Sequence, residues 1–202
     1  MTTGIVIAGG PSERFGVEDK ALATLNGSAM LRHVVDRLAA VCDELVVNCR
    51  QEQRPAFEDV LGDVEVPIRI AVDPVQYAGP VAGLETALER VDDEVTIAIG
   101  CDAPFVSPRA FAELQETLVG GGDVDVVVPH AGGRKQPLGG VYYVDALAAA
   151  IDALGDTENA SLFAILDRLE VGVVPADRLP GGERAFRNVN TRADLERVRT
   201  QE

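Results

Sequence analysis

The chain begins with MTTGIVIAGGPSERFGVEDK, residues 1–20. Residues 4–8 form a short run rich in branched apolar side chains, which predicts a buried parallel strand that ends at a glycine pair. The loop that follows contains glycine, proline and serine together with Arg14 and Lys20. Its backbone can approach a ligand closely, and its cations can neutralise an anion. The stretch therefore predicts a strand followed by a loop that binds phosphate.

This loop lacks the spacing of two common phosphate-binding motifs. No Gly-Lys-Ser/Thr follows the glycines, which excludes the Walker loop, and they do not fall as G-x-G-x-x-G, which excludes the dinucleotide fingerprint. A surface turn after an edge strand is the alternative without a function, because glycine and charged residues are common in such turns. The pattern that needs an explanation is AGGPSERFG followed by DK.

The composition indicates one α/β domain. A chain of 202 residues is long enough for one such domain with a substantial core, and no linker divides it. No apolar run approaches the roughly 18 residues of a membrane span, and no secretion signal is visible. The three cysteines lack C-x-x-C spacing, which argues against a zinc site or a disulfide framework. We therefore expect a soluble protein of the reducing cytoplasm.

The charge balance is strongly acidic, with 33 acidic and 18 basic residues and a formal net charge of −15. Such a surface repels nucleic acid and anionic membranes, and salt screens its self-repulsion. We therefore expect no nucleic-acid or membrane partner, and a salt-rich cytosol fits. The two lysines, Lys20 and Lys135, both lie in Gly/Pro-rich stretches that also carry an arginine. Either coding bias and chance or a need for a compact ammonium explains their placement.

Strand-like and helix-like segments alternate along the chain. Helical spacing predicts helices at 29–41, 51–61, 81–91, 107–119, 145–154 and 160–169, and one that begins at 191. Ser28 and Ser107 are the expected caps of the first and fourth of these helices. Further strands are predicted at 44–49, 66–72, 95–99, 124–128, 138–144 and 171–174, with a loop at 175–187.

This order predicts a single-domain, mostly parallel, doubly wound sheet with helices on both faces, a Rossmann-like fold. The strand at 95–99 is the most apolar and is expected at the centre of the sheet. Small or polar residues follow the ends of several strands; these are Gly9, Gly10, Asn48, Asp73 and Asp102. Ligands of open α/β sheets bind at the carboxyl ends of the strands, so we expect these residues to converge on one face.

Asp102 lies in GCDAP, residues 100–104, at the exit of the most buried strand. A carboxylate there is costly unless it is paired, and a divalent cation that bridges it to substrate phosphates is the usual solution. Mg²⁺ keeps several waters, so one carboxylate is enough, and we assign Mg²⁺ to Asp102. The alternative is that Asp102 caps the following helix, although Ser107 is better placed for that.

Two further loops have the composition of anion sites. Gly79 lies in YAGPVAGL, residues 77–84, whose small residues let a helix N-terminus approach an anion, although a Gly-Pro turn can simply start a helix. GGRKQPLG, residues 132–139, is a cationic loop that suits an anionic substrate or else forms a solvated hairpin tip. Its candidate binding residues are Arg134, Lys135, Gln136 and Pro137.

Four motifs, in this order along the chain, resemble those of the molybdenum cofactor guanylyltransferases, a family of nucleotidyltransferases. AGGPSERFG with DK is similar to the family's L-A-G-G-x-S-x-R-x-G followed by D-K, with Ile7 in place of leucine. GPVAGL is similar to G-P-L-A-G-L, CDAP to C-D-x-P, and NVNT at 188–191 to N-x-N-T. The resemblance spans almost the whole chain.

The resemblance implies a set of nucleotide-binding residues in the first half of the chain: Ile7, Ala8, Gly9, Gly10, Lys20, Asn48, Asp73, Gly79 and Asp102. A carboxylate at Asp73 suits guanine, whose N1–H and exocyclic amine are both donors. Asn48 could instead simply terminate its strand. C-D-x-P is the metal-binding motif of the family, which again implies Mg²⁺ at Asp102.

The resemblance also implies the reaction. The phosphate of molybdopterin, free or carrying molybdenum, would attack the α-phosphorus of GTP in line and expel pyrophosphate. Arg14 and Lys20 would hold phosphate oxygens and Asp102 the Mg²⁺, as the catalytic groups. The acceptor would bind in the second half through residues 134–137, Asn188 and Asn190, although Asn190 or Thr191 could merely cap the last helix. A transient contact with a molybdoenzyme or its chaperone is expected.

Other functions are compatible with the same motifs. Within the fold, these are cytidylyl transfer to the cofactor, or guanylyl transfer to a cobamide or phospholactate precursor. From other classes, the chain could be a non-catalytic nucleotide-binding module, or a subunit that hands the cofactor to a molybdoenzyme. The presence of both Lys20 and Asp102 argues against the non-catalytic module.

Overall fold

The computed structural model describes residues 1–11, 15 and 19–199, so Arg14, a predicted phosphate ligand, lies outside the described residues. The described residues form an eight-stranded sheet with the order β10-β7-β9-β6-β1-β4-β5, and β8 pairs with β7 beside this path. The strands are β1 (Thr2–Ile7), β4 (Glu44–Cys49), β5 (Ile68–Val72), β6 (Val95–Gly100), β7 (Val126–Ala131), β8 (Arg134–Lys135), β9 (Gly140–Tyr143) and β10 (Val171–Pro175).

The sheet is mostly parallel, as predicted, and β6 occupies its predicted central position. β5, β4, β1 and β6 run parallel, as do β7 and β10. β9 is antiparallel and lies between β6 and β7. The segment between β7 and β9 is too short for a crossover helix, so the chain turns back as a hairpin and reverses this strand.

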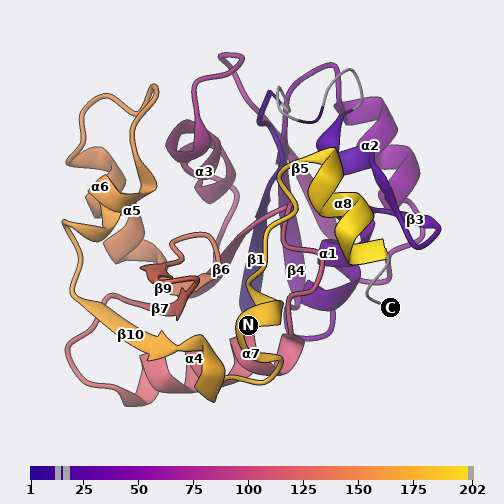
Figure 1. The fold of residues 1–202 in the computed structure, drawn as a ribbon. Helices are drawn as coiled ribbons and strands as arrows, with labels where there is room; N and C mark the ends of the chain where they lie inside the picture. Colours follow the sequence, from indigo (N-terminus) through magenta and orange to yellow (C-terminus); the bar gives the residue numbers. More distant parts are fainter. Residues whose placement is uncertain (12–14, 16–18, 200–202) are drawn as a thin grey trace.

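Helices cover both faces of the sheet, which confirms the doubly wound fold. They are α1 (Met30–Leu38), α2 (Arg54–Leu61), α3 (Pro80–Leu88), α4 (Pro108–Gly120), α5 (Val144–Asp152), α6 (Leu162–Leu166), α7 (Gly182–Ala185) and α8 (Arg192–Arg199). Figure 1 shows α3, α5 and α6 on one side of β1 and β4, and α1 and α2 on the other. Among the described residues, no helix has the length and apolarity needed to cross a bilayer.

β1 shows why the first strand reads as a continuous apolar run. Val6 packs in the cluster that contains α1, α2 and α4, whereas Ile5 and Ile7 pack in the cluster that contains α3, α5 and α6. Successive side chains of a strand point to opposite faces, and both faces are covered here. A strand buried on both sides has apolar residues on both faces, so the apolar run at residues 5–7 does not alternate with polar side chains.

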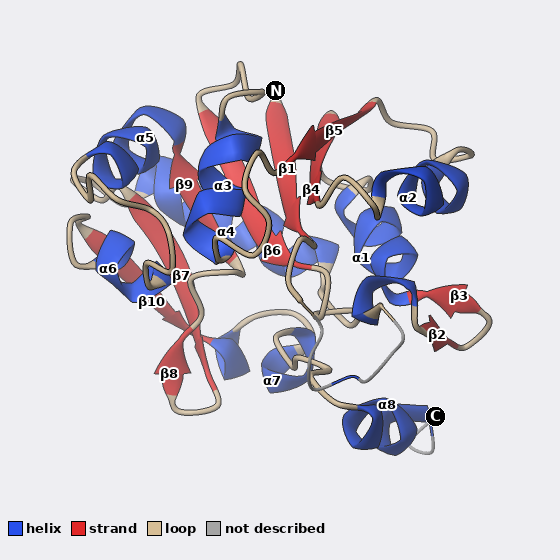
Figure 2. Cartoon of the chain, turned by 90° about the horizontal axis from the view of Figure 1, so that it is seen from above, coloured by secondary structure: helices blue, strands red, loops and turns tan. Residues whose placement is uncertain are grey.

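Two predicted side-chain caps need correction, although Ser107 does occupy the N-cap position of α4. Ser28 does not cap α1, because it pairs with Leu25 in a hairpin of β2 (Thr24–Leu25) and β3 (Ser28–Ala29). α8 packs against this hairpin through a third apolar cluster, and Figure 2 shows it on that side of the molecule. Ser107 does precede α4, but its side chain makes no capping hydrogen bond with the described residues.

Two other predictions fail because the true elements are short. The helix predicted at 160–169 is confined to α6, which Ser161 caps by accepting a hydrogen bond from the Phe163 amide at 3.2 Å. The loop predicted at 175–187 contains the 3-10 turn η3 (Ala176–Arg178) and α7. Elements of three to five residues are too short to show a hydrophobic period.

The acidic surface leads to a prediction about salt. Some carboxylates pair with arginines, as Asp36 and Asp63 do with Arg32, but the excess of 15 negative charges cannot be paired within the chain. Screening shortens the range of this repulsion to about 10 Å at 0.1 M salt. We therefore expect the melting temperature to rise as KCl is added from low ionic strength. A flat or falling curve would contradict this.

Candidate active site

The loops that carry the predicted site residues leave the sheet side by side. Ile7, the last residue of β1, pairs with Asn48 of β4 and with Gly100 of β6. Asp73 follows β5, whose last residue pairs with Cys49. The carboxyl ends of four parallel strands therefore lie at one level, as the sequence predicts.

Two pockets open at this edge of the sheet. The first, here called the central pocket, has a volume of about 390 Å³ and is lined by residues that include Gly10, Lys20, Asp102 and Asn190. The second, here called the side pocket, has a volume of about 120 Å³, and its lining includes Gly9, Asn48, Asp73 and Gly79. Ile7, Gly10 and Pro11 line both pockets, so the backbone that follows β1, here called the glycine loop (residues 8–11), lies between two adjacent pockets.

A lysine and a carboxylate form the centre of the central pocket. Lys20 Nζ lies 2.9 Å from Asp102 Oδ2 and donates to Asn190 Oδ1 at 3.3 Å. Burial is the largest single influence on Lys20 and lowers its pKa, but the surrounding negative groups, chiefly the Asp102 carboxylate, together raise the pKa above its usual value. The ammonium is therefore charged at neutral pH, and it is positioned to meet an anion.

Asp19 explains how Lys20 reaches this position. Lys20 is the first residue of the 3-10 helix η2 (Lys20–Leu22), and the Asp19 side chain caps that helix by accepting from the Ala21 amide at 2.9 Å. The other carboxylate oxygen of Asp19 accepts from Gln53 Nε2 at 2.6 Å. In the Asp-Lys pair, Asp19 therefore stabilises the turn, and Lys20 lines the central pocket.

The oxygen atoms of the central pocket suit a hard cation. Asp102 and Asn190 direct oxygens at the same ammonium, so they can converge on a single positive charge. The described part of the chain has no cluster of three or more His, Cys, Asp or Glu residues that could hold a metal ion. Mg²⁺ fits such a sparse set when water and substrate phosphates complete its octahedral shell.

The side pocket contains a buried amide and a carboxylate in contact. Asn48 Nδ2 donates to Asp73 Oδ1 at 2.5 Å and to the Ala71 carbonyl at 3.4 Å. Burial raises the pKa of Asp73, and the Asn48 hydrogen bond and the Arg50 charge offset this only in part. Asn48 Oδ1 is buried and finds no hydrogen-bond partner among the described residues. A ligand rich in donors would satisfy both side chains.

Two glycines allow this close packing. A Cβ at Gly9 would lie 2.4 Å from Asp73 Oδ2, and a Cβ at Gly83 would lie 2.7 Å from Asn48 Oδ1. Either contact would displace the polar pair, so the backbone of the glycine loop and of α3 must lack side chains here. Gly79 has φ of 98° and precedes α3, which starts at Pro80. In GPVAGL, Gly79 is therefore needed for its positive φ and Gly83 for the space that Asn48 occupies.

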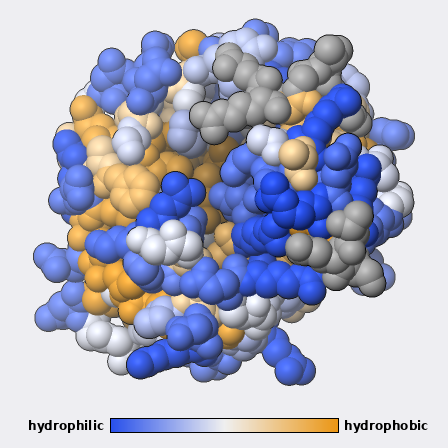
Figure 3. Space-filling model, in the orientation of Figure 1, coloured by the Kyte–Doolittle hydropathy of each residue, from blue (hydrophilic) through white to orange (hydrophobic). Residues whose placement is uncertain are grey.

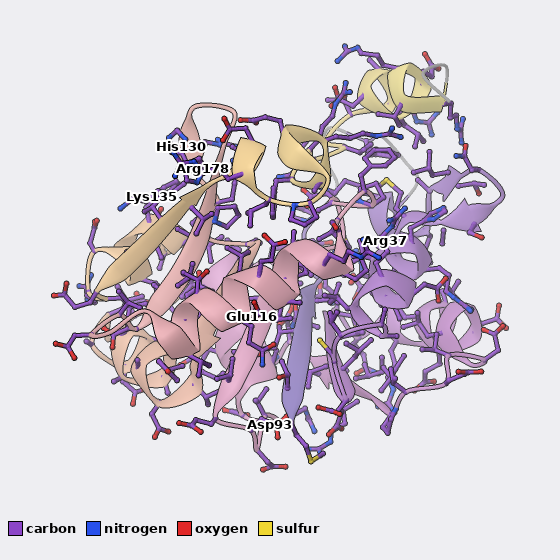
Figure 4. All side chains as sticks on the ribbon, turned by 90° about the horizontal axis from the view of Figure 1, so that it is seen from below. Arg37, Asp93, Glu116, His130, Lys135 and Arg178 are labelled. Atoms are coloured by element: carbon purple, nitrogen blue, oxygen red, sulfur yellow. The ribbon has the colours of Figure 1, made fainter. Side chains whose placement is uncertain are left out.

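The cationic loop is a hairpin and also borders two pockets. Gly132 and Gly133 have φ of 58° and 76° and form its tip, so the hairpin alternative describes its shape correctly. Lys135 pairs with His130 across the hairpin, and Figure 4 shows the two side chains together. Gln136 is buried and donates to the Ala131 carbonyl at 2.8 Å, which fixes the base of the hairpin.

The hairpin pocket, of about 650 Å³, lies between this hairpin and the segment from α7 to α8. Its lining residues include Arg134, Gln136, Arg184, Arg187, Asn188 and Asn190. Asn190 also lines the central pocket, so the two hollows are neighbours. The sequence prediction missed Arg184 and Arg187, since both lie where it placed a featureless loop.

The α6 pocket, of about 290 Å³, lies on the other side of the hairpin and is lined partly by apolar residues. These include Pro137, Leu138 and Phe163, beside Arg134 and Asn188. Phe163 is 43% exposed, so part of its ring is open to a ligand. Figure 3 shows apolar residues gathered on the side of the molecule where α5 and α6 lie. This pocket suits a flat, partly apolar ligand.

In the N-x-N-T segment, residues 188–191, neighbouring residues make different contacts. The Asn190 side-chain oxygen accepts a hydrogen bond from the Lys20 ammonium at 3.3 Å. Thr191 and Asp194 exchange hydrogen bonds between side chains and backbone, which is the capping box of α8. Val189 is buried, and its amide donates to the Asp102 carbonyl at 2.8 Å. This bond joins the C-terminal segment to the loop that carries Asp102.

Comparison with known proteins agrees with this geometry. The family model described as MobA-like NTP transferase domain matches residues 4–172. A probable molybdenum cofactor guanylyltransferase of Natronomonas pharaonis is 34% identical over 200 residues, with 98% of this chain and 96% of that protein covered. A protein of the same name from Haloferax mediterranei is 35% identical, with 95% and 90% covered.

Solved structures share the fold at lower identity. Molybdopterin-guanine dinucleotide biosynthesis protein A of Archaeoglobus fulgidus has a TM-score of 0.77 at 24% identity, with 100% of this chain and 98% of that chain covered. The 4-diphosphocytidyl-2C-methyl-D-erythritol synthase of Anaerococcus prevotii has a TM-score of 0.79 at 16% identity, with 100% and 95% covered. The family match and the relatives above 30% identity show that this chain is a nucleotidyltransferase of the MobA-like NTP transferase family.

Proposed function

We propose that this protein transfers GMP from GTP to the phosphate of molybdopterin, free or carrying molybdenum, and releases pyrophosphate. The observation that carries the proposal is that Lys20, Asp102 and Asn190 meet where the central pocket adjoins the hairpin pocket. A charged centre between two hollows suits a transfer between two bound substrates. The names of the relatives from Natronomonas and Haloferax supply the substrate class.

The guanine base is assigned to the side pocket. Asp73 can accept hydrogen bonds from both N1–H and the exocyclic amine, and the unpartnered Asn48 Oδ1 is a further acceptor. The triphosphate then extends over Gly9 and Gly10 into the central pocket. The nucleotide site is completed by Ile7, which lines both pockets, by Ala8 of the central pocket and by Gly79 of the side pocket.

The acceptor is assigned to the second half of the chain. The arginines of the hairpin pocket suit its phosphate, and the apolar wall of the α6 pocket suits a flat pterin ring. Arg134, Gln136 and Asn188 line both pockets, so one ligand can contact them from either side. Lys135 and Pro137 border the α6 pocket.

The chemistry needs positioning and charge neutralisation more than a covalent enzyme intermediate. Lys20 would hold phosphate oxygens. Asp102 and Asn190 are the residues that would hold Mg²⁺, and the ion would supply neutralisation of phosphate charge. Arg14 is proposed to contact phosphate as well, although it lies outside the described residues. The acceptor phosphate approaches the α-phosphorus in line with the departing pyrophosphate.

Rival activities differ in the nucleotide or the acceptor. The diphosphocytidyl synthase of Anaerococcus prevotii has the same fold, so the fold by itself leaves the base open. Cytidylyl transfer to the cofactor, and guanylyl transfer to a cobamide or phospholactate precursor, would use the same central pocket. A non-catalytic nucleotide-binding module would bind nucleotide without turnover.

One assay separates these possibilities. Pyrophosphate release is measured with Mg²⁺ and each of the four nucleoside triphosphates, with and without molybdopterin. We expect release with GTP only, and only when molybdopterin is present. Consumption of CTP would replace the guanylyl proposal with a cytidylyl one, and binding without release would favour the non-catalytic module.

The protein is proposed to act in the cytoplasm and to hand its product to a molybdoenzyme or its chaperone. Cys42, Cys49 and Cys101 are buried free thiols in the described residues. Burial raises the pKa of Cys42 to about 12 and that of Cys49 to about 11, so both stay protonated. Such thiols fit a reducing compartment. Co-purification with a tagged molybdoenzyme, dependent on loaded cofactor, tests the transfer contact.

The two lysines of the chain give a matched pair of variants. Lys20→Met removes the cation of the central pocket, so we expect kcat to fall by roughly 10- to 100-fold, the loss of one strong charged hydrogen bond. Lys20→Arg is expected to recover only part of this rate, because a planar fork reaches phosphate oxygens differently. Lys135→Met should instead raise the KM for molybdopterin. Equal kinetics for Lys20→Met and the unaltered protein would remove Lys20 from the mechanism.

A further inference from the structure

We infer that Arg50 is a positioning residue that fixes the glycine loop and the side pocket relative to each other, so that base and phosphates bind as one unit. This rests on the proposed function only in that the ligand is a nucleoside triphosphate. Arg50 follows β4 directly, and its side chain is 8% exposed. Arg50 does not line the central pocket or the side pocket, so it acts through the residues with which it forms hydrogen bonds.

The guanidinium of Arg50 binds four groups from three segments. Its Nη1 donates to the Gly9 carbonyl at 2.7 Å and to the Gly10 carbonyl. Its Nη2 donates to Asp19 Oδ2 at 3.3 Å, and its Nε donates to Glu52 Oε1 at 2.7 Å. Two carboxylates thus balance the charge of this nearly buried arginine.

The bonds to the carbonyls decide which way the glycine loop presents its amide. In a trans peptide the C=O and the next N–H point in opposite directions. Because the Gly9 carbonyl is turned to Arg50, the Gly10 N–H points away from Arg50. Gly10 lines both nucleotide pockets, and Pro11, which follows it, has no N–H to offer. Arg50 therefore orients the Gly10 amide, which can donate to a phosphate.

The same side chain supports the turn before Lys20. Asp19 accepts from both Arg50 and Gln53, while it caps η2 with its other oxygen. Gln53 also donates to the Ala8 carbonyl at 3.1 Å and accepts from the Arg50 amide at 2.8 Å. The turn between β4 and α2 thus holds both the glycine loop, at residues 8–10, and Asp19.

The flat face of the guanidinium meets the wall of the side pocket. Arg50 Cζ lies 5.2 Å from the centre of the Tyr77 ring, within the range of a cation–π contact. Tyr77 lines the side pocket and has φ of 62°, a conformation that few non-glycine residues adopt. Glu52, which binds Arg50 Nε, also accepts from Gln76 Nε2 at 3.1 Å. The 73–80 loop is therefore attached to Arg50 directly at Tyr77 and through Glu52 at Gln76.

An arginine is needed for this arrangement. The planar fork reaches two carbonyls and two carboxylates at once and still offers its face to a ring, whereas an ammonium is a point charge on a flexible stem. Arg54, four residues later, provides a matched control. It forms an exposed i,i+4 pair with Glu58 and contacts neither the glycine loop nor Tyr77 in any described interaction.

The experiment compares Arg50→Met, Arg50→Lys and Arg54→Met by calorimetric binding of Mg²⁺–pyrophosphate, GTP and guanosine. We expect Arg50→Met to weaken pyrophosphate and GTP binding by roughly 10- to 100-fold, since a small misplacement of binding groups has large effects. Guanosine binding should change by about threefold or less, and Arg54→Met should stay within about twofold for every ligand. Arg50→Lys, which retains the charge and is the safer variant for folding, should lose affinity to an intermediate degree.

Three results would overturn the inference. Unchanged pyrophosphate affinity in both Arg50 variants would show that the loop is positioned without this side chain. An equal loss for guanosine and pyrophosphate would reduce Arg50 to a general structural role, as would full activity of Arg50→Lys. Pyrophosphate contains no base, so the proposed guanine preference is tested separately. If the unaltered protein bound pyrophosphate but not GTP, the base assignment would fail while the comparison for Arg50 would still hold.

Discussion

Asp102→Asn is expected to lower kcat by roughly 10²- to 10³-fold while the protein remains folded, the loss typical of removing one strong electrostatic contact from an active site. A neutral amide cannot hold Mg²⁺ against water as a carboxylate can. It also removes the negative partner of Lys20, which leaves the ammonium beside Asn190. The backbone carbonyl of Asp102, which accepts from Val189, is unchanged.

The stability of this variant separates catalysis from folding. The Lys20–Asp102 pair is 19% exposed at each side chain, and such partly exposed pairs contribute about 1 kcal/mol or less. A loss of that size lowers the melting temperature by about 2–4 °C in a domain of this length. Asp36→Asn makes the same chemical change at an exposed pair with Arg32 and should retain activity. Wild-type turnover of Asp102→Asn at limiting Mg²⁺ would place the metal elsewhere.

The main features of the fold could be predicted because they depend on local patterns. β6 is central because it has no polar side chain between Ile97 and Gly100, and the glycine pair after β1 marks the end of a buried strand. The convergence of Asn48, Asp73 and Asp102 followed from one rule about parallel strands. The reversed direction of β9 could have been predicted as well, since too few residues connect it to β7 for a crossover.

The residues that position the site, such as Arg50 and Gly83, could not be predicted in the same way. Arg50 contacts carbonyls that lie 40 and 41 residues earlier in the chain, and backbone acceptors leave no mark on the sequence. Gly83 was noted only among the small residues of 77–84 and of a family motif, although the space that Asn48 occupies beside it is the physical reason for a glycine there. Both roles depend on tertiary packing. The one local hint was that Arg50, like Asn48, stands at the end of β4.

Asp73→Asn is expected to reduce the preference for GTP over CTP by roughly 10²-fold, since the lost carboxylate accepts from two guanine donors and such charged hydrogen bonds are individually strong. Burial raises the pKa of Asp73 above its ordinary value near 4, so protonation begins at a higher pH than for an exposed aspartate. A protonated carboxyl has one acceptor fewer for guanine. GTP affinity should therefore fall as the pH is lowered through this range, and Asp73→Asn should lack the dependence.

Stability should change in the opposite direction. Because the folded-state pKa of Asp73 is raised, the native state holds more protons than the unfolded state between the two pKa values, and stability falls as pH rises through that window. At neutral pH the buried charge is a cost, so Asp73→Asn should retain or raise the melting temperature. Asp93→Asn is the control: Asp93 is half-buried, accepts from Thr3 Oγ1 at 2.7 Å, and lies at the opposite end of the molecule from His130 and Lys135 in Figure 4. A lower melting temperature for Asp73→Asn, with equal losses for all four triphosphates, would mean that Asp73 supports the fold and does not select the base.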